Sequence, residues 1–218
     1  MMSFSVGVYD LFAYTIPGFF YLFIGNEILK SFGFSHLNYQ DISNPTTVVL
    51  LIFAAFVFGH VMDFVADKWK SFLEKEKVAT LAIDALKRNF PDLNVKFQPN
   101  ERSILFAIIR RNHDDIAATI DRNKAISILF QNVSLGFFLY AVFLVVQMLL
   151  SGYALNNLVF SIMSIIMSVA TRHQGRMFNL WFNSLIFEVA LTYGTNTKEI
   201  LKNIQSQKKA QNKSAGTI

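Results

Sequence analysis

The sequence predicts an all-α protein with four transmembrane helices and helical cytoplasmic extensions. The chain is 53% apolar and only 16% charged, whereas a soluble domain is typically about a quarter charged. Residues 125–171 form a run of 47 without Asp, Glu, Lys, Arg or His. One span needs about 20 apolar residues, so this run predicts two spans joined by a turn. The third observation is that the basic residues lie almost entirely in two segments.

The first span is the shortest of the four. Residues 11–26 are uncharged, and a helix is expected over residues 6–29. Pro17 should kink this helix because proline removes one backbone hydrogen bond. Sixteen residues give about 24 Å of helix, slightly less than a bilayer core. A re-entrant or interfacial helix is therefore the alternative for this segment.

The other three spans have clearer limits. Asn44 is a good N-cap and Pro45 a good first helical residue for the second span. That helix should run on to about residue 90 as an amphipathic helix with Phe72 on its apolar face, and Pro91 would stop it. Asn100 is the expected cap of a short apolar helix after that, and Asp114 should begin another helix that continues into the third span. The long uncharged run divides at residues 151–157, which predicts spans at 126–150 and 154–171. A turn this short makes them an antiparallel hairpin.

The positions of Lys and Arg predict the orientation. Residues 67–125 hold twelve of them and residues 172–218 hold seven, while Lys30 is the only one between the first two spans. Basic segments stay in the cytoplasm, so both basic segments and both termini are expected there.

Five parts follow from these limits. They are the first two spans with a short periplasmic loop (1–66), a basic helical cytoplasmic segment (67–125), a transmembrane hairpin (126–171), cytoplasmic amphipathic helices (172–205) and a disordered tail (206–218). The segment 67–125 looks too short for a sizeable core of its own. The apolar positions after the fourth span predict an amphipathic helix that lies on the inner leaflet or packs on the cytoplasmic helices.

His60, Asp63 and Asp67 are the first candidate site. Their spacing places them on one face of a helix, and ionisable groups in a membrane are functional candidates by default. A metal site would need further ligands that the sequence does not supply at a suitable spacing. We therefore interpret the stretch mainly as a membrane exit, with Asp63 expected to pair with Arg172 or Arg176 at the end of the fourth span.

Polar residues inside the hairpin form the second candidate group. Small and amide side chains in spans usually pack helices closely or hydrogen-bond to neighbours, and they line pores less often. The candidates for helix packing or a pore lining are Gln131, Asn132, Ser161, Ser164 and Ser168.

Several classes of chemistry are disfavoured. The chain has no cysteine, so thiolate metal sites and Cys nucleophiles are excluded. No Gly-rich phosphate loop, nucleophile elbow or zinc-protease motif occurs. An RNase of the HEPN type needs an Arg four to six residues before a His, and no pair around His113 has that spacing. The positive-inside rule accounts for the net charge of +5 without nucleic acid. We expect no cofactor and no enzymatic activity.

Three stretches carry a resemblance to a known group. "YDLFAYTIPGFF", "FGHVMDFV" and "RHQGRMFNLWF", with the basic middle and the hairpin between them, resemble small multi-pass proteins of bacterial anti-phage loci. These include the membrane accessory proteins of RNA-targeting type VI CRISPR systems. The resemblance implies a protein of the bacterial inner membrane that oligomerises and perturbs the membrane beside a defence partner protein.

The leading hypothesis is thus a non-enzymatic membrane effector or accessory whose partners are anionic lipids, further copies of itself and a defence protein. The alternative is a channel or transporter subunit in which His60 and Asp63 move ions or protons. A membrane-bound enzyme ranks last because no nucleophile, base and orienting group emerge together.

Overall fold

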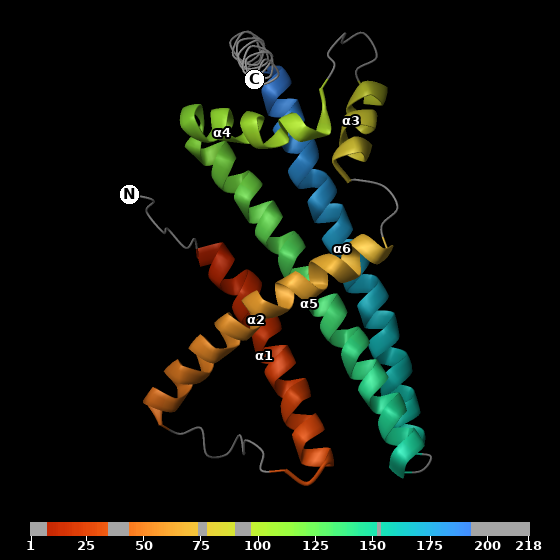
Figure 1. The fold of residues 1–218 in the computed structure, drawn as a ribbon. Coiled ribbons are helices and arrows are strands. Elements are labelled where there is room, and N and C mark those ends of the chain that lie inside the picture. Colours follow the sequence, from red (N-terminus) through yellow and green to blue (C-terminus); the bar gives the residue numbers. More distant parts are fainter. Residues whose placement is uncertain (1–7, 35–43, 74–77, 90–96, 152–153, 193–218) are drawn as a thin grey trace, which may run out of the picture. The chain divides into compact units, whose positions relative to one another are not determined.

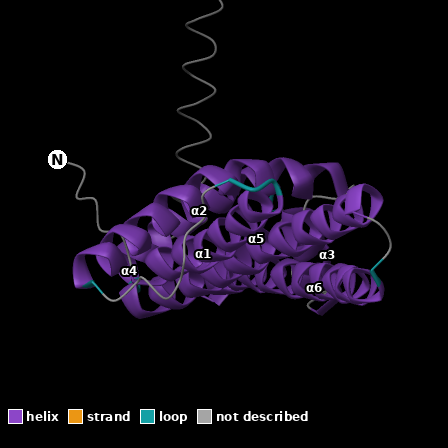
Figure 2. Ribbon diagram, turned by 90° about the horizontal axis from the view of Figure 1, so that it is seen from below, coloured by secondary structure: helices purple, strands orange, loops and turns teal. Residues whose placement is uncertain are grey.

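The computed structural model describes residues 8–34, 44–73, 78–89, 97–151 and 154–192, and within them every regular element is a helix (Figures 1 and 2). The helices are α1 (Val8–Ser31), α2 (Pro45–Leu73), α3 (Val78–Asn89), the short 3₁₀ helix η2 (Pro99–Glu101), α4 (Arg102–Asn112), α5 (Asp114–Ser151) and α6 (Leu155–Thr192). The all-α class is confirmed for this part of the chain.

Three of these helices are long and apolar enough to cross a membrane: α2 over Pro45–Phe72, α5 over Asp114–Leu150 and α6 over Leu155–Thr192. The protein is therefore a helical membrane protein. The first predicted span does form the 24-residue helix α1, but α1 is not one of the three.

Helix starts follow the predicted signals in two cases and depart from them in one. The side chain of Asn44 accepts a hydrogen bond from the backbone N–H of Thr46 at 2.9 Å, as an N-cap should. α5 begins at Asp114, where acidic residues favour a helix N-terminus. Asn100, expected as the cap of the next helix, instead lies inside η2, and Glu101 immediately precedes α4.

The chain forms two compact units. We call Met1–Lys75 with Asp121–Asn179 the membrane unit, and Glu76–Ile120 with Leu180–Ile218 the helical core unit. Among the described residues, every exposed large apolar side chain except Trp181 belongs to the membrane unit. Apolar side chains facing outward are typical of a surface that lipid or another chain covers.

The helical core unit is built in the opposite way, with its large apolar side chains inside. The buried set is Ala82, Ile83 and Leu86 of α3, Leu105 and Ile109 of α4, Ala117 and Ile120 of α5, and Phe182, Ile186, Phe187, Val189 and Ala190 of α6. The segment after α2 was expected to lack a sizeable core, and this unit has one because the end of α6 completes it. Of the two placements predicted for that amphipathic helix, the structure shows packing on the neighbouring helices.

The predicted continuation of the second span to residue 90 is described only in part. α2 is described to Leu73 and α3 from Val78, and residues 74–77 between them lie outside the described residues. Phe72, expected on the apolar face of that continuation, is 82% exposed. The buried apolar side chains of this stretch are those of α3, which pack into the core of the helical core unit.

α1 and α2 touch through their backbones near the middle of each helix (Figure 1). A Cβ added to Gly18 would lie 1.7 Å from the carbonyl oxygen of Ala55, and one added to Gly59 would lie 1.9 Å from that of Tyr14. Ala55 is fully buried at this crossing. Ala55 and Gly59 form a small-xxx-small pair, which lets two membrane helices approach closely.

Candidate functional site

A buried polar cluster joins three helices of the membrane unit. The Asn132 side chain on α5 donates a hydrogen bond from Nδ2 to Oδ1 of Asp63 on α2 at 2.9 Å. The hydroxyl of Tyr21 on α1 donates to the backbone oxygen of Asn132 at 2.6 Å. We call Tyr21, Asp63 and Asn132 the polar junction. It fixes α1, α2 and α5 to one another by directional bonds.

Asn132 is the centre of this junction because it is fully buried. Its Nδ2 makes a second bond to the backbone oxygen of Ile128 at 3.2 Å, so both amide hydrogens are used. Its Oδ1 is buried and has no hydrogen-bond partner among the described residues. The amide therefore stabilises the Asp63 carboxylate and keeps one acceptor inside the unit, where unpaired polar atoms are costly.

The structure places Asp63 differently from the predicted ion pair. Among the described residues, Asp63 forms no salt bridge with Arg172 or Arg176, and a neutral amide takes the place of the guanidinium. Asp67 and Arg176 are exposed, and Arg172 is half-buried. A buried amide satisfies a carboxylate without the desolvation cost of a second ion.

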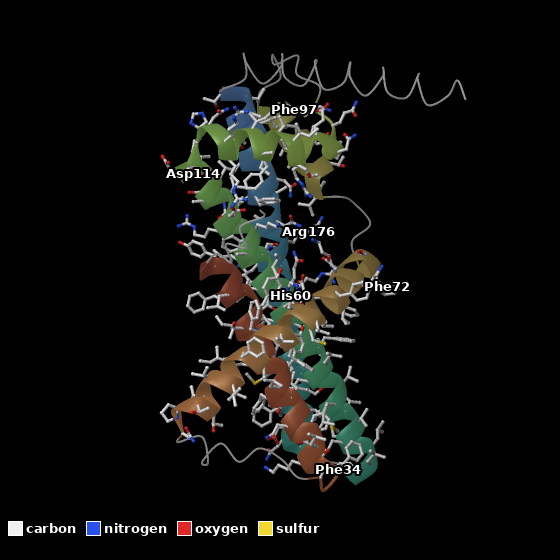
Figure 3. All side chains as sticks on the ribbon, turned by 60° about the vertical axis from the view of Figure 1, so that its left-hand side comes forward. Phe34, His60, Phe72, Phe97, Asp114 and Arg176 are labelled. Atoms are coloured by element: carbon white, nitrogen blue, oxygen red, sulfur yellow. The ribbon has the colours of Figure 1, made fainter. Side chains whose placement is uncertain are left out.

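His60 lies outside the polar junction. It is exposed, and its ring meets the ring of Tyr14 edge-on at 4.7 Å and lies parallel to that of Phe56 at 6.3 Å, between centroids. Figure 3 labels it on α2. In the described part of the chain no three His, Asp or Glu side chains gather as metal ligands. The local geometry therefore shows His60 as part of an aromatic contact between α1 and α2.

The serines of the hairpin lie in the interface between α5 and α6. Ser134 and Ser168 bond reciprocally, each hydroxyl donating to the other's backbone oxygen at 2.8 Å. Ser161 donates to the backbone oxygen of Ala141 at 3.3 Å, and Ser164 is buried as well. The hydroxyls of Ser134, Ser161 and Ser168 thus form hydrogen bonds between the two helices, which is a packing geometry in which they do not line a pore.

Gln131 takes part in the same interface. Its amide donates to the hydroxyl of Ser127 at 2.8 Å, and Ser127 donates to the backbone oxygen of Gly175 at 2.8 Å. A Cβ on Gly175 would lie 3.0 Å from the Gln131 side chain, so the two helices approach closely here.

Sequence reasoning missed two features of this region. The Ala55-xxx-Gly59 pattern was available as a packing signal, since small residues four apart favour close crossing. Tyr21 gave no such signal, because its partner lies 111 residues away and only packing brings them together.

No protein-family model, curated protein sequence or solved structure matches this chain. Its site is therefore interpreted from its own geometry: a buried structural junction in a helical membrane unit.

Proposed function

We propose that this protein is a non-enzymatic, multi-pass protein of the bacterial inner membrane that serves as an anti-phage defence effector or CRISPR accessory, oligomerises and perturbs the bilayer. The observation that carries the proposal is the outward-facing apolar surface of α2. Only 11% of the most apolar 18-residue stretch of α2 is buried within the protein. Lipid or a second copy of the protein is the partner that such a surface requires.

The exposed position of His60 supports self-association. It lies between apolar exposed residues such as Phe58 and Val61. An ionisable side chain facing hydrocarbon is costly, and a neighbouring copy would cover it. The defence role itself rests on the resemblance of three sequence stretches to proteins of anti-phage loci.

Liposome leakage tests this activity. Purified protein in vesicles of phosphatidylethanolamine and phosphatidylglycerol should release a trapped dye, with a rate that rises more steeply than linearly with the protein-to-lipid ratio, because several copies are required. In cells, induced expression should depolarise the membrane while total RNA stays intact, and His113→Ala should behave like the parent. Degraded RNA in the parent but not in His113→Ala would establish the catalytic alternative instead.

The competing function is an ion or proton pathway through Asp63. Its support is the position of this carboxylate between three helices, bonded to a buried amide. Proton flux into pH-sensitive vesicles separates the two functions, since a pathway of this kind would give flux at low protein density that Asp63→Asn abolishes. We expect no such flux.

Four spans, with both termini in the cytoplasm, are part of the proposal. The chain has no cysteine, so single cysteines can be labelled cleanly at Ser5 and Ser35, which lie outside the described residues. A membrane-impermeant maleimide should label Ser35→Cys in intact spheroplasts and Ser5→Cys only after lysis. Labelling of Ser5→Cys from outside would mean that α1 does not cross. Residue 35 precedes α2, so in the proposed orientation it would be periplasmic with three spans as well as with four.

A further inference from the structure

A small hollow opens between α2, α5 and α6 within the membrane unit. Its lining side chains are Ala66, Trp69, Lys70, Gln131, Ser134 and Arg172. Lys70 and Arg172 are half-buried cations, and among the described residues neither forms an ion pair. Two cations at one hollow without a carboxylate partner create a site with positive potential.

Trp69 supplies a donor at the same place. Its ring stacks on Phe138 with centroids 4.4 Å apart, which fixes the indole. The Nε1–H is buried and has no hydrogen-bond partner among the described residues. A buried donor without an acceptor is destabilising, and an anionic oxygen in the hollow would remove that cost.

Asp67, one turn before Lys70 on α2, is an exposed carboxylate, while the other polar groups around this hollow are already engaged. Asp63, two turns before Lys70 on α2, accepts the bond from Asn132. The Ser134 hydroxyl donates to Ser168, and Gln131 donates one amide hydrogen to Ser127. The remaining donors of the hollow are therefore the two cations, the indole and the second amide hydrogen of Gln131.

The hollow has a volume of about 10 Å³, which admits one group the size of a water molecule. We propose that it takes up one phosphate oxygen of an anionic phospholipid headgroup, with Lys70 and Arg172 neutralising the charge of the headgroup and the Trp69 indole donating a hydrogen bond. The assignment rests on the proposed orientation, in which the C-terminal end of α2 and the middle of α6 meet the inner leaflet. Tryptophan and basic side chains are the residues that favour this level of a membrane. Inorganic phosphate offers the same chemistry, so the test must separate the two sources.

Fluorescence quenching tests the site directly, because the chain has two tryptophans and Trp181→Phe leaves Trp69 as the sole emitter. The protein in detergent micelles is titrated with brominated phosphatidylglycerol or brominated phosphatidylcholine. Each basic residue near an anionic headgroup contributes about fivefold in affinity. Because the hollow has two basic residues, we expect phosphatidylglycerol to quench Trp69 with an affinity roughly 25-fold higher than phosphatidylcholine.

Two double variants that remove the same charge distinguish binding in the hollow from a general electrostatic attraction between the protein and anionic lipid. Lys70→Gln with Arg172→Gln should abolish the preference for phosphatidylglycerol. Lys68→Gln with Arg176→Gln removes the same charge from exposed positions outside the hollow and should retain it. If the first pair does not fold, either single substitution within it should reduce the preference by about fivefold.

Three outcomes would overturn the assignment. These are no preference in the parent, equal loss in both variant pairs, or competition by inorganic phosphate together with equal quenching by the two lipids. The last would identify a soluble phosphate as the ligand. Lipid binding in micelles does not depend on membrane perturbation. A failed quenching test therefore leaves the proposed function standing, and a failed leakage test leaves the lipid site standing.

Discussion

Gly59→Leu is expected to separate α1 from α2 and to destabilise the membrane unit by about 3 kcal/mol or more. The reason is that a Cβ at Gly59 would lie 1.9 Å from the backbone oxygen of Tyr14. Backbone cannot rotate away as a side chain can, so the helices must move apart. Gly18→Leu should behave in the same way, because its Cβ would meet the backbone of Ala55 at 1.7 Å.

Unfolding in mixed dodecylmaltoside and sodium dodecyl sulfate micelles measures this loss. Disulfide formation between one cysteine placed on each helix near the crossing measures the separation independently. Gly25→Ala is the matched control, since a Cβ there meets nothing within 4 Å. Alanine in a helix is more favourable than glycine by about 0.5–1 kcal/mol, so this variant should be as stable as the parent or slightly more so. A Gly59→Leu protein with parental stability and crosslinking would show that α1 and α2 do not cross there.

Asp63→Ala and Asn132→Ala are each expected to lower the free energy of unfolding by about 1–3 kcal/mol. Both remove the bond between Nδ2 and Oδ1 that links α2 to α5 at 2.9 Å. Because they share one interaction, the double variant should cost less than the sum of the two, by about 1–2 kcal/mol. The measurement is a double-mutant cycle in the same mixed micelles.

Asp67→Ala is the control for this cycle, since Asp67 is exposed one turn further along α2 and lies outside the junction. It should change stability by no more than about 0.5 kcal/mol. Asp63→Asn should retain both the fold and the leakage activity if the junction is structural. Additive single effects would mean that Asp63 and Asn132 do not interact. Exchange of charge between Asp63 and Arg172 should not restore stability, because the structure does not pair them.

Features that depend on the local chain were predictable. The hairpin turn was expected at residues 151–157, and α5 ends at Ser151 while α6 begins at Leu155. The cap at Asn44 and the start at Asp114 also follow the sequence, because capping involves only neighbouring backbone groups. The long uncharged run identified membrane helices because hydrocarbon imposes the same requirement on every residue within it.

The partners of the polar side chains were not predictable in this way. Asp63 was assigned to arginines at the end of the fourth predicted span, yet it bonds to an amide 69 residues away on α5. Helix rotation and axial position decide which side chains face each other, and these depend on packing over the whole contact. The close approach at Gly18 and Gly59 helps to set that packing for α1 and α2.

The sequence by itself thus determined that this is an all-α membrane protein with a long helical hairpin, since composition decides which segments can lie in hydrocarbon. Only the tertiary structure decided that the end of α6 completes the core of the helical core unit, and that Asn132 rather than an arginine satisfies Asp63. Both outcomes depend on which faces of the helices pack against each other, and the sequence of one helix does not specify which face of another helix it will contact.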